Sequence, residues 1–196
     1  PEWVEILNRD ISHPSIVGWC PFNETQGNQD NRILEYIYKV TREIDPTRPI
    51  IDTSGWVHTK FTDVYDMHDY DQDIESFARK LDPFKTGDTP YVTLSDPSTY
   101  KKGTPYFVSE FGGTWWAPDK EGWGYGNAPN TEEEFLKRFE GLVRYLLNHP
   151  KVCAFCYTQL TDVEQEVNGL YTYDRKPKFD PEIIRQIVSA KAAIEY

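Results

Sequence analysis

The chain has 196 residues, a formal net charge of −11 and a pI of about 4.8, and 38% of its residues are hydrophobic. A chain of this length normally forms one domain with its own core. The acidic balance disfavours binding to nucleic acids or anionic membranes, because both require basic surface to neutralise phosphate. No segment approaches the ~20 apolar residues of a membrane-spanning helix. No secretion signal is visible, and the location in the cell stays open.

Helical and strand patterns alternate along the chain, which is typical of α/β folds. In chain order, the patterns predict the end of a helix at Glu2–Asn8, a strand at Ile16–Phe22, a helix at Asp30–Ile44, short strands at Ile50–Thr53 and Asp63–His68, a helix at Asp71–Leu81 and a strand at Tyr106–Phe111. A capping-box start at Thr131 predicts a helix with an apolar face up to Leu147. A strand at Val152–Tyr157 and a helix at Glu182–Ile194 follow, the latter begun by Asp180 and Pro181. Asp82–Gly103 and Trp115–Asn130 are predicted to be long loops.

The three cysteines, Cys20, Cys153 and Cys156, give no disulfide framework because their number is odd. Cys153 and Cys156 have the spacing of a redox or zinc motif. They lie, however, in the apolar run Val152–Tyr157, where side chains three positions apart point to opposite faces of a strand. We therefore expect these two to be buried structural thiols.

Two glutamates mark the ends of apolar, strand-like runs: Glu24 comes after Ile16–Phe22, and Glu110 lies near the end of Tyr106–Phe111. Apolar runs bounded by turn residues predict buried parallel strands. A carboxylate at the C-terminal tip of such a strand lies where barrel enzymes place their chemistry. Two carboxyl groups, one acid and one nucleophile, are what glycoside hydrolysis requires. From the residues alone, a solvated Glu24 in a turn and a Glu110 paired with a nearby cation stay open.

Three motifs, in order, resemble glycoside hydrolase family 2, the family of β-galactosidases, β-glucuronidases and β-mannosidases. They are Arg9-Asp10-Ile11-Ser12-His13-Pro14-Ser15-Ile16 leading to Asn23-Glu24, then Ser109-Glu110-Phe111-Gly112-Gly113, and finally Tyr157–Tyr171. The resemblance spans nearly the whole chain. It implies an α/β fold, a partial (β/α)8 TIM barrel with parallel strands four to eight and outer helices. Because a complete barrel takes about 250 residues, residues 1–196 are expected to be the C-terminal portion of the barrel in a larger multidomain enzyme.

The resemblance also implies a retaining β-glycosidase that works through a covalent glycosyl-enzyme. Glu110 would be the nucleophile and Glu24 the general acid/base, with Asn23 bonded to the sugar 2-hydroxyl. Tyr70 falls where the family carries a tyrosine that donates a hydrogen bond to the nucleophile. The alternative for Tyr70 is a tyrosine that only packs.

Three further residues are candidates for substrate binding. His68 either faces the sugar or is a core histidine with satisfied hydrogen bonds. Trp115 either lines a subsite or anchors its loop by packing. Gln159 follows the last predicted strand and is expected to reach substrate hydroxyls.

The expected partner is a carbohydrate, a β-galactoside rather than a β-glucuronide. Gly112-Gly113-Thr114-Trp115 stands where the glucuronidase branch carries an Asn-x-Lys element that resembles a carboxylate-reading motif. No cofactor and no complete metal site are expected, because the Mg²⁺ or Na⁺ that some family members bind takes ligands mostly from earlier strands. The alternative class is a non-catalytic carbohydrate-binding or assembly module with a barrel-derived fold. Residues 1–196 alone are expected to be inactive as a glycosidase and to self-associate through open sheet edges as a homo-oligomer.

Overall fold

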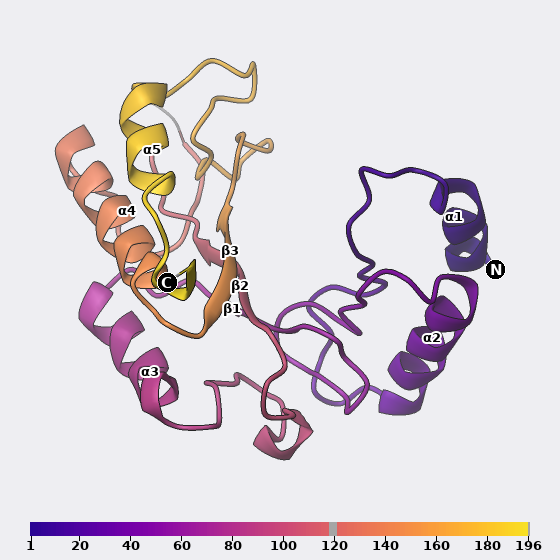
Figure 1. The fold of residues 1–196 in the computed structure, drawn as a ribbon. Coiled ribbons are helices and arrows are strands. Elements are labelled where there is room, and N and C mark those ends of the chain that lie inside the picture. Colours follow the sequence, from indigo (N-terminus) through magenta and orange to yellow (C-terminus); the bar gives the residue numbers. More distant parts are fainter. Residues whose placement is uncertain (118–120, 196) are drawn as a thin grey trace. The chain divides into compact units, whose positions relative to one another are not determined.

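The computed structural model describes residues 1–117 and 121–195. It divides into two compact units, Pro1–His68 with Asp88–Phe107, and Asp69–Gly87 with Val108–Tyr196. Three strands, β1 (Tyr65–Asp69), β2 (Tyr106–Gly112) and β3 (Val152–Thr158), form a parallel sheet in the order β1-β2-β3. Together with the helices labelled in Figure 1, this sheet confirms the predicted α/β class.

The first unit contains helices α1 (Glu2–Asp10) and α2 (Asn31–Ile44), which pack against each other (Figure 1). The side chain of Asp30 caps α2 by accepting a hydrogen bond from the Arg32 amide. Under the two helices lies a core of Leu7, Trp19 and Ile50. Trp3 meets Trp19 edge to face at 6.1 Å between ring centroids, a favoured geometry for aromatic rings.

The predicted strands Ile16–Phe22 and Ile50–Thr53 are wrong as continuous strands, although the two segments do pair in parallel. Isolated parallel bridges join Trp19 to Ile50 and Asn23 to Ser54. The Trp19 amide donates to the Pro49 carbonyl at 3.0 Å, and the Ser54 amide donates to the Phe22 carbonyl at 2.8 Å. Between these bonds, Pro21 has no amide hydrogen, so a regular ladder is interrupted.

The second unit is built on helices that pack in series, α3 (Ile74–Thr86) against α4 (Glu132–Leu147) and α4 against α5 (Pro181–Val188). Thr131 caps α4 as predicted, since its hydroxyl accepts from the Glu134 amide at 3.2 Å. The carboxylate of Glu134 reaches one residue further back than a standard capping box, to the Asn130 amide at 2.7 Å. Short 3₁₀ turns occur at Pro97–Thr99 and Ala193–Glu195.

Several element boundaries differ from the prediction. Helix α3 continues past Pro83 to Thr86, because proline in the last turn removes only one bond and the following Phe84 is buried. Helix α5 ends at Val188, short of the predicted Ile194. None of the helices in the described part of the chain is long and apolar enough to span a membrane.

The prediction of buried thiols is wrong for Cys153 and Cys156. Both residues are exposed, as is Cys20. The two cysteines lie on β3, which is the last strand in the order of the described sheet and has a neighbouring strand on one side only. Side chains on both faces of such a strand can therefore reach solvent.

Candidate active site

The predicted site residues divide between the two units. Asn23, Glu24 and His68 belong to the first unit, whereas Tyr70, Glu110, Trp115 and Gln159 belong to the second. We call the first group, with Ser54, the Glu24 cluster. We call the second group, with Tyr125 and Tyr157, the Glu110 cluster.

The backbone of Glu24 adopts a left-handed conformation with φ of +49°. Its amide donates to the Ser54 carbonyl at 2.8 Å, which fixes the residue beside the segment that follows Ile50. A non-glycine residue in this region costs on the order of 1–3 kcal/mol, and such residues concentrate at functional sites. The neighbouring Asn23 is exposed, and its backbone forms the bridge to Ser54.

The imidazole of His68 holds the carboxyl group of Glu24. Nδ1 of His68 lies 2.9 Å from Oε1 of Glu24, and Nε2 lies 3.0 Å from Oγ of Ser54. The His68 side chain is fully buried, whereas the Glu24 side chain keeps 35% of its surface exposed. The buried ring with both nitrogens hydrogen-bonded fits the alternative of a core histidine, and this histidine also contacts the candidate acid/base. Its contact with substrate stays a prediction.

The Glu110 cluster is built around a tyrosine. Glu110 lies on β2 and is half-buried, and the hydroxyl of Tyr70 donates a hydrogen bond to its Oε2. Burial and this hydrogen bond raise the pKa of Tyr70, so the hydroxyl remains a neutral donor at physiological pH. The Tyr70 ring stacks on Tyr125, with centroids 3.7 Å apart and planes 3° apart. Tyr70 therefore contacts the carboxylate and packs at the same time.

Two glycines after Glu110 let aromatic rings lie directly on the backbone. Gly112 and Gly113 have φ of +79° and +60°. A Cβ atom on Gly112 would lie 2.3 Å from the Tyr157 ring, and one on Gly113 would lie 2.5 Å from the Tyr125 ring. Glycine avoids both the left-handed strain and the overlap.

The other predicted contacts are held within the second unit. Trp115 is half-buried, and its Nε1 has no hydrogen-bond partner among the described residues. Gln159 follows a cis peptide bond, and its amide donates to Oδ1 of Asn168 at 2.8 Å. The neighbouring Asp162 is buried in an ion pair with Lys178 at 2.6 Å. The roles of Trp115 and Gln159 in substrate binding stay predictions.

Two residues that complete these clusters were not predicted. Ser54 lies in a short segment without an apolar pattern, and Tyr125 lies in a loop rich in Gly and Trp. Side-chain hydrogen bonds between segments and ring stacking do not follow a period in the sequence, so these contacts required the structure.

Comparison with solved structures shows the fold. Faecalibacterium prausnitzii β-glucuronidase matches with a TM-score of 0.67 and 20% identity over 93% of this chain and 33% of its own. Lactobacillus rhamnosus β-glucuronidase matches with a TM-score of 0.71 and 18% identity over 98% of this chain and 35% of its own. The GH2 β-galacturonidase from Eisenbergiella tayi, bound to galacturonate, matches with a TM-score of 0.69 and 16% identity over 94% of this chain and 35% of its own.

The chain thus spans about a third of the length of these neighbours. At these identities, the likeness shows the fold alone. A search among curated protein sequences finds no match.

A sequence model of the family described as "Glycosyl hydrolases family 2, TIM barrel domain" matches residues 2–118, which is more than half of the chain. The α/β sheet confirmed above fits that domain, and the match confirms the partial TIM barrel that the motifs around Glu24 and Glu110 imply. This chain belongs to glycosyl hydrolase family 2.

Proposed function

We propose that the protein carrying this chain is a retaining β-glycosidase in which Glu110 is the nucleophile and Glu24 is the general acid/base. The observation that carries this proposal is the hydrogen bond from the neutral hydroxyl of Tyr70 to Oε2 of Glu110. A donor on one oxygen holds the carboxylate in a fixed orientation for attack on the anomeric carbon. Family membership supports the hydrolase class.

In the first step, Glu110 attacks the anomeric carbon while Glu24 gives its proton to the leaving glycosidic oxygen. The Tyr70 hydroxyl stabilises the anionic form of Glu110 before attack and again when the carboxylate is released. In the second step, Glu24 takes a proton from water, and that water displaces Glu110 from the sugar. Every proton and bond in this sequence is supplied by the two carboxyl groups, the substrate and water, without a cofactor.

We further propose a β-galactoside, or a related neutral glycoside, as the substrate. The solved neighbours include β-glucuronidases and a β-galacturonidase, which act on sugars that carry a carboxylate. Recognition of a carboxylate favours a cationic partner. Gly112, Gly113, Thr114 and Trp115, which follow the nucleophile segment, carry no charge. A uronidase remains the outcome to be distinguished by experiment.

The roles are tested with a series of nitrophenyl glycosides that includes the β-galactoside and the β-glucuronide. Glu110→Gln is expected to abolish glycosyl-enzyme formation with every substrate. Glu24→Ala is expected to spare substrates with good leaving groups in the first step, and azide is expected to restore the second step. The matched control is Glu75→Gln, because Glu75 is exposed on α3.

Normal turnover by Glu110→Gln would refute the assignment of the nucleophile. Faster turnover of the β-glucuronide than of the β-galactoside would refute the substrate proposal and leave the mechanism standing. Binding of glycosides without turnover would favour the alternative, a carbohydrate-binding module with a barrel-derived fold.

A further inference from the structure

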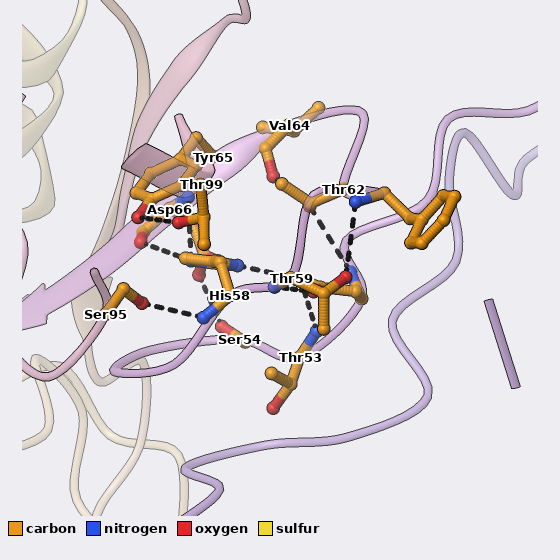
Figure 2. Close-up of polar contacts among 12 residues, drawn as sticks. Thr53, Ser54, His58, Thr59, Thr62, Val64, Tyr65, Asp66, Ser95 and Thr99 are labelled. Atoms are coloured by element: carbon orange, nitrogen blue, oxygen red, sulfur yellow. Dashed lines mark hydrogen bonds and ion pairs between the residues drawn. The ribbon is translucent and has the colours of Figure 1, made fainter. Parts of the chain in front are cut away.

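A buried polar network in the first unit connects to the Glu24 cluster through Ser54. Asp52, His58 and Asp66 are all at most 2% exposed. Nδ1 of His58 lies 2.7 Å from Oδ1 of Asp52, and Nε2 lies 2.8 Å from the Asp66 carbonyl and 3.1 Å from Oδ1 of the Asp66 side chain. Figure 2 shows His58 bonded to the strand that carries Asp66, with Ser54 close by.

The ring of His58 is positively charged. Burial by itself would lower the pKa of His58, but the hydrogen bonds to Asp52 and Asp66 and the charges of these carboxylates raise it to about 10. Nε2 of His58 also lies 3.3 Å from the Asp66 amide nitrogen. This distance is longer than those from Nε2 to the carbonyl oxygen and to Oδ1 of Asp66. Both ring nitrogens therefore donate, Nδ1 to the Asp52 carboxylate and Nε2 to the Asp66 carbonyl, while Oδ1 of Asp66 lies within ion-pair distance of Nε2.

Ser54 connects this network to the site. Its Oγ lies 2.6 Å from Oδ2 of Asp66 and donates to it, because a carboxylate can only accept. A hydroxyl has one proton, so at the contact of 3.0 Å with Nε2 of His68 the Ser54 oxygen is the acceptor. Nε2 of His68 must therefore carry the hydrogen.

The remaining nitrogen of His68 faces the acid/base. Nδ1 lies 2.9 Å from Oε1 of Glu24, and a contact of this length needs a proton between the two atoms. Either neutral His68 accepts from the protonated carboxyl of Glu24, or the imidazolium of His68 donates to the carboxylate. In both arrangements, the Glu24–His68 pair holds one proton.

We propose that His58, Asp66 and Ser54 are positioning residues that fix the hydrogen of His68 on Nε2, so that the Glu24–His68 pair stores the one proton that the leaving group receives. This inference rests on the proposed function. When the glycosidic oxygen takes the proton, the leaving alcohol carries it away. The water of the second step returns one proton to the pair, so the cycle closes without another donor.

The test compares leaving groups. Ser54→Ala should lower kcat/KM about 10- to 100-fold for phenyl and alkyl glycosides, part of the roughly 10²- to 10⁴-fold that general acid catalysis contributes. For a dinitrophenyl glycoside, which needs no acid in the first step, the loss should be less than about 3-fold. Thr41→Val is the control, because it removes a hydrogen-bonded hydroxyl that contacts Trp3 and Ile37 and takes no part in the network.

The outcomes separate this inference from the proposed function. If Glu24→Ala slows all substrates equally, the assignment of the acid/base fails. If Glu24→Ala discriminates between leaving groups but Ser54→Ala slows all of them equally, the acid/base stands and the positioning role of Ser54 is refuted.

A second measurement does not depend on activity. In ¹⁵N NMR after histidine labelling, the signals of His58 and His68 are assigned by comparison with variants that lack each ring, and they report which ring nitrogens carry a proton. We expect His58 to be protonated on both nitrogens at pH 7 and His68 to carry a hydrogen on Nε2, and Ser54→Ala to change the His68 signals selectively. A neutral His68 with its hydrogen on Nδ1 in the wild type would overturn the proposal.

Discussion

The left-handed backbone conformation of Glu24 leads to a prediction about stability that can be tested without measuring activity. The test compares Glu24→Gly with Glu24→Ala. Both variants lose the carboxyl group and its hydrogen bond to His68, so these losses cancel in the difference between them. What remains is the response of the backbone at φ of +49° to a Cβ atom.

The magnitude follows from two opposing terms. A residue with a Cβ costs roughly 1–2 kcal/mol in the left-handed region. Glycine loses more conformational freedom on folding, which offsets roughly 0.5–1 kcal/mol of that advantage. We therefore expect Glu24→Gly to be more stable than Glu24→Ala by about 0.5–1 kcal/mol, which corresponds to about 1–4 °C in Tm for a protein of this size.

The same pair of substitutions at Glu35 is the control. Glu35 lies inside α2 with ordinary helical geometry, where glycine is about 1 kcal/mol less favourable than alanine. Denaturant unfolding of the four variants should thus give opposite signs at the two positions. If glycine destabilises position 24 as it does position 35, the left-handed conformation of Glu24 is absent in solution and the strain argument fails.

Three further predictions concern His58, Tyr70 and Gly112. Because folding raises the pKa of His58 from 6.5 to about 10, its contribution to stability is complete below about pH 6.5 and is lost as the pH rises to 10. Urea unfolding should show a loss in the free energy of unfolding on the order of 5 kcal/mol over this range. The dependence of that free energy on pH should be flatter in His58→Gln, and an unchanged dependence would contradict the assignment. Tyr70→Phe should lower kcat about 10²-fold, because it removes the hydrogen bond to Glu110. Its Tm should stay within a few degrees of the wild type, because the stacking on Tyr125 is retained. An unchanged kcat would exclude a catalytic role of the hydroxyl. Gly112→Ala should destabilise the protein by about 1–3 kcal/mol more than Gly103→Ala, because both glycines have positive φ but only at Gly112 would a Cβ atom overlap a ring. Equal losses of stability in thermal unfolding would contradict the packing of Tyr157 on Gly112.

The α/β class and most helices could be predicted because they depend on local signals. The apolar stripe after Asp30 and the cap at Thr131 mark the starts of α2 and α4 within one or two residues. Strand β3 was likewise predicted from its apolar run. The segments around Trp19 and Ile50 misled the prediction, because their composition is that of strands while Pro21 and Pro49 limit the pairing to isolated bridges.

The candidate site could be predicted only in part. Glu24, Glu110 and Tyr70 were selected on their motifs, and the structure places the Tyr70 hydroxyl on Glu110. The network from His58 through Ser54 to His68 was not predicted, because it joins side chains whose spacing follows no period. The exposure of Cys153 and Cys156 was also missed, since a run of apolar residues does not reveal which strand has a neighbour on one side only.

The stacking of Tyr125 on Tyr70 has a consequence for how such an enzyme can be altered by mutation. Tyr125 lies in a loop and is fixed by its amide, which donates to the Gly113 carbonyl at 2.8 Å. A substitution at Tyr125 would shift the phenol that holds Glu110 while every residue on β2 stays unchanged. Loops accept substitutions and insertions more readily than strands do. Variation in this loop is therefore a route by which evolution, or a library of engineered variants, can adjust the reactivity of the nucleophile without replacing it.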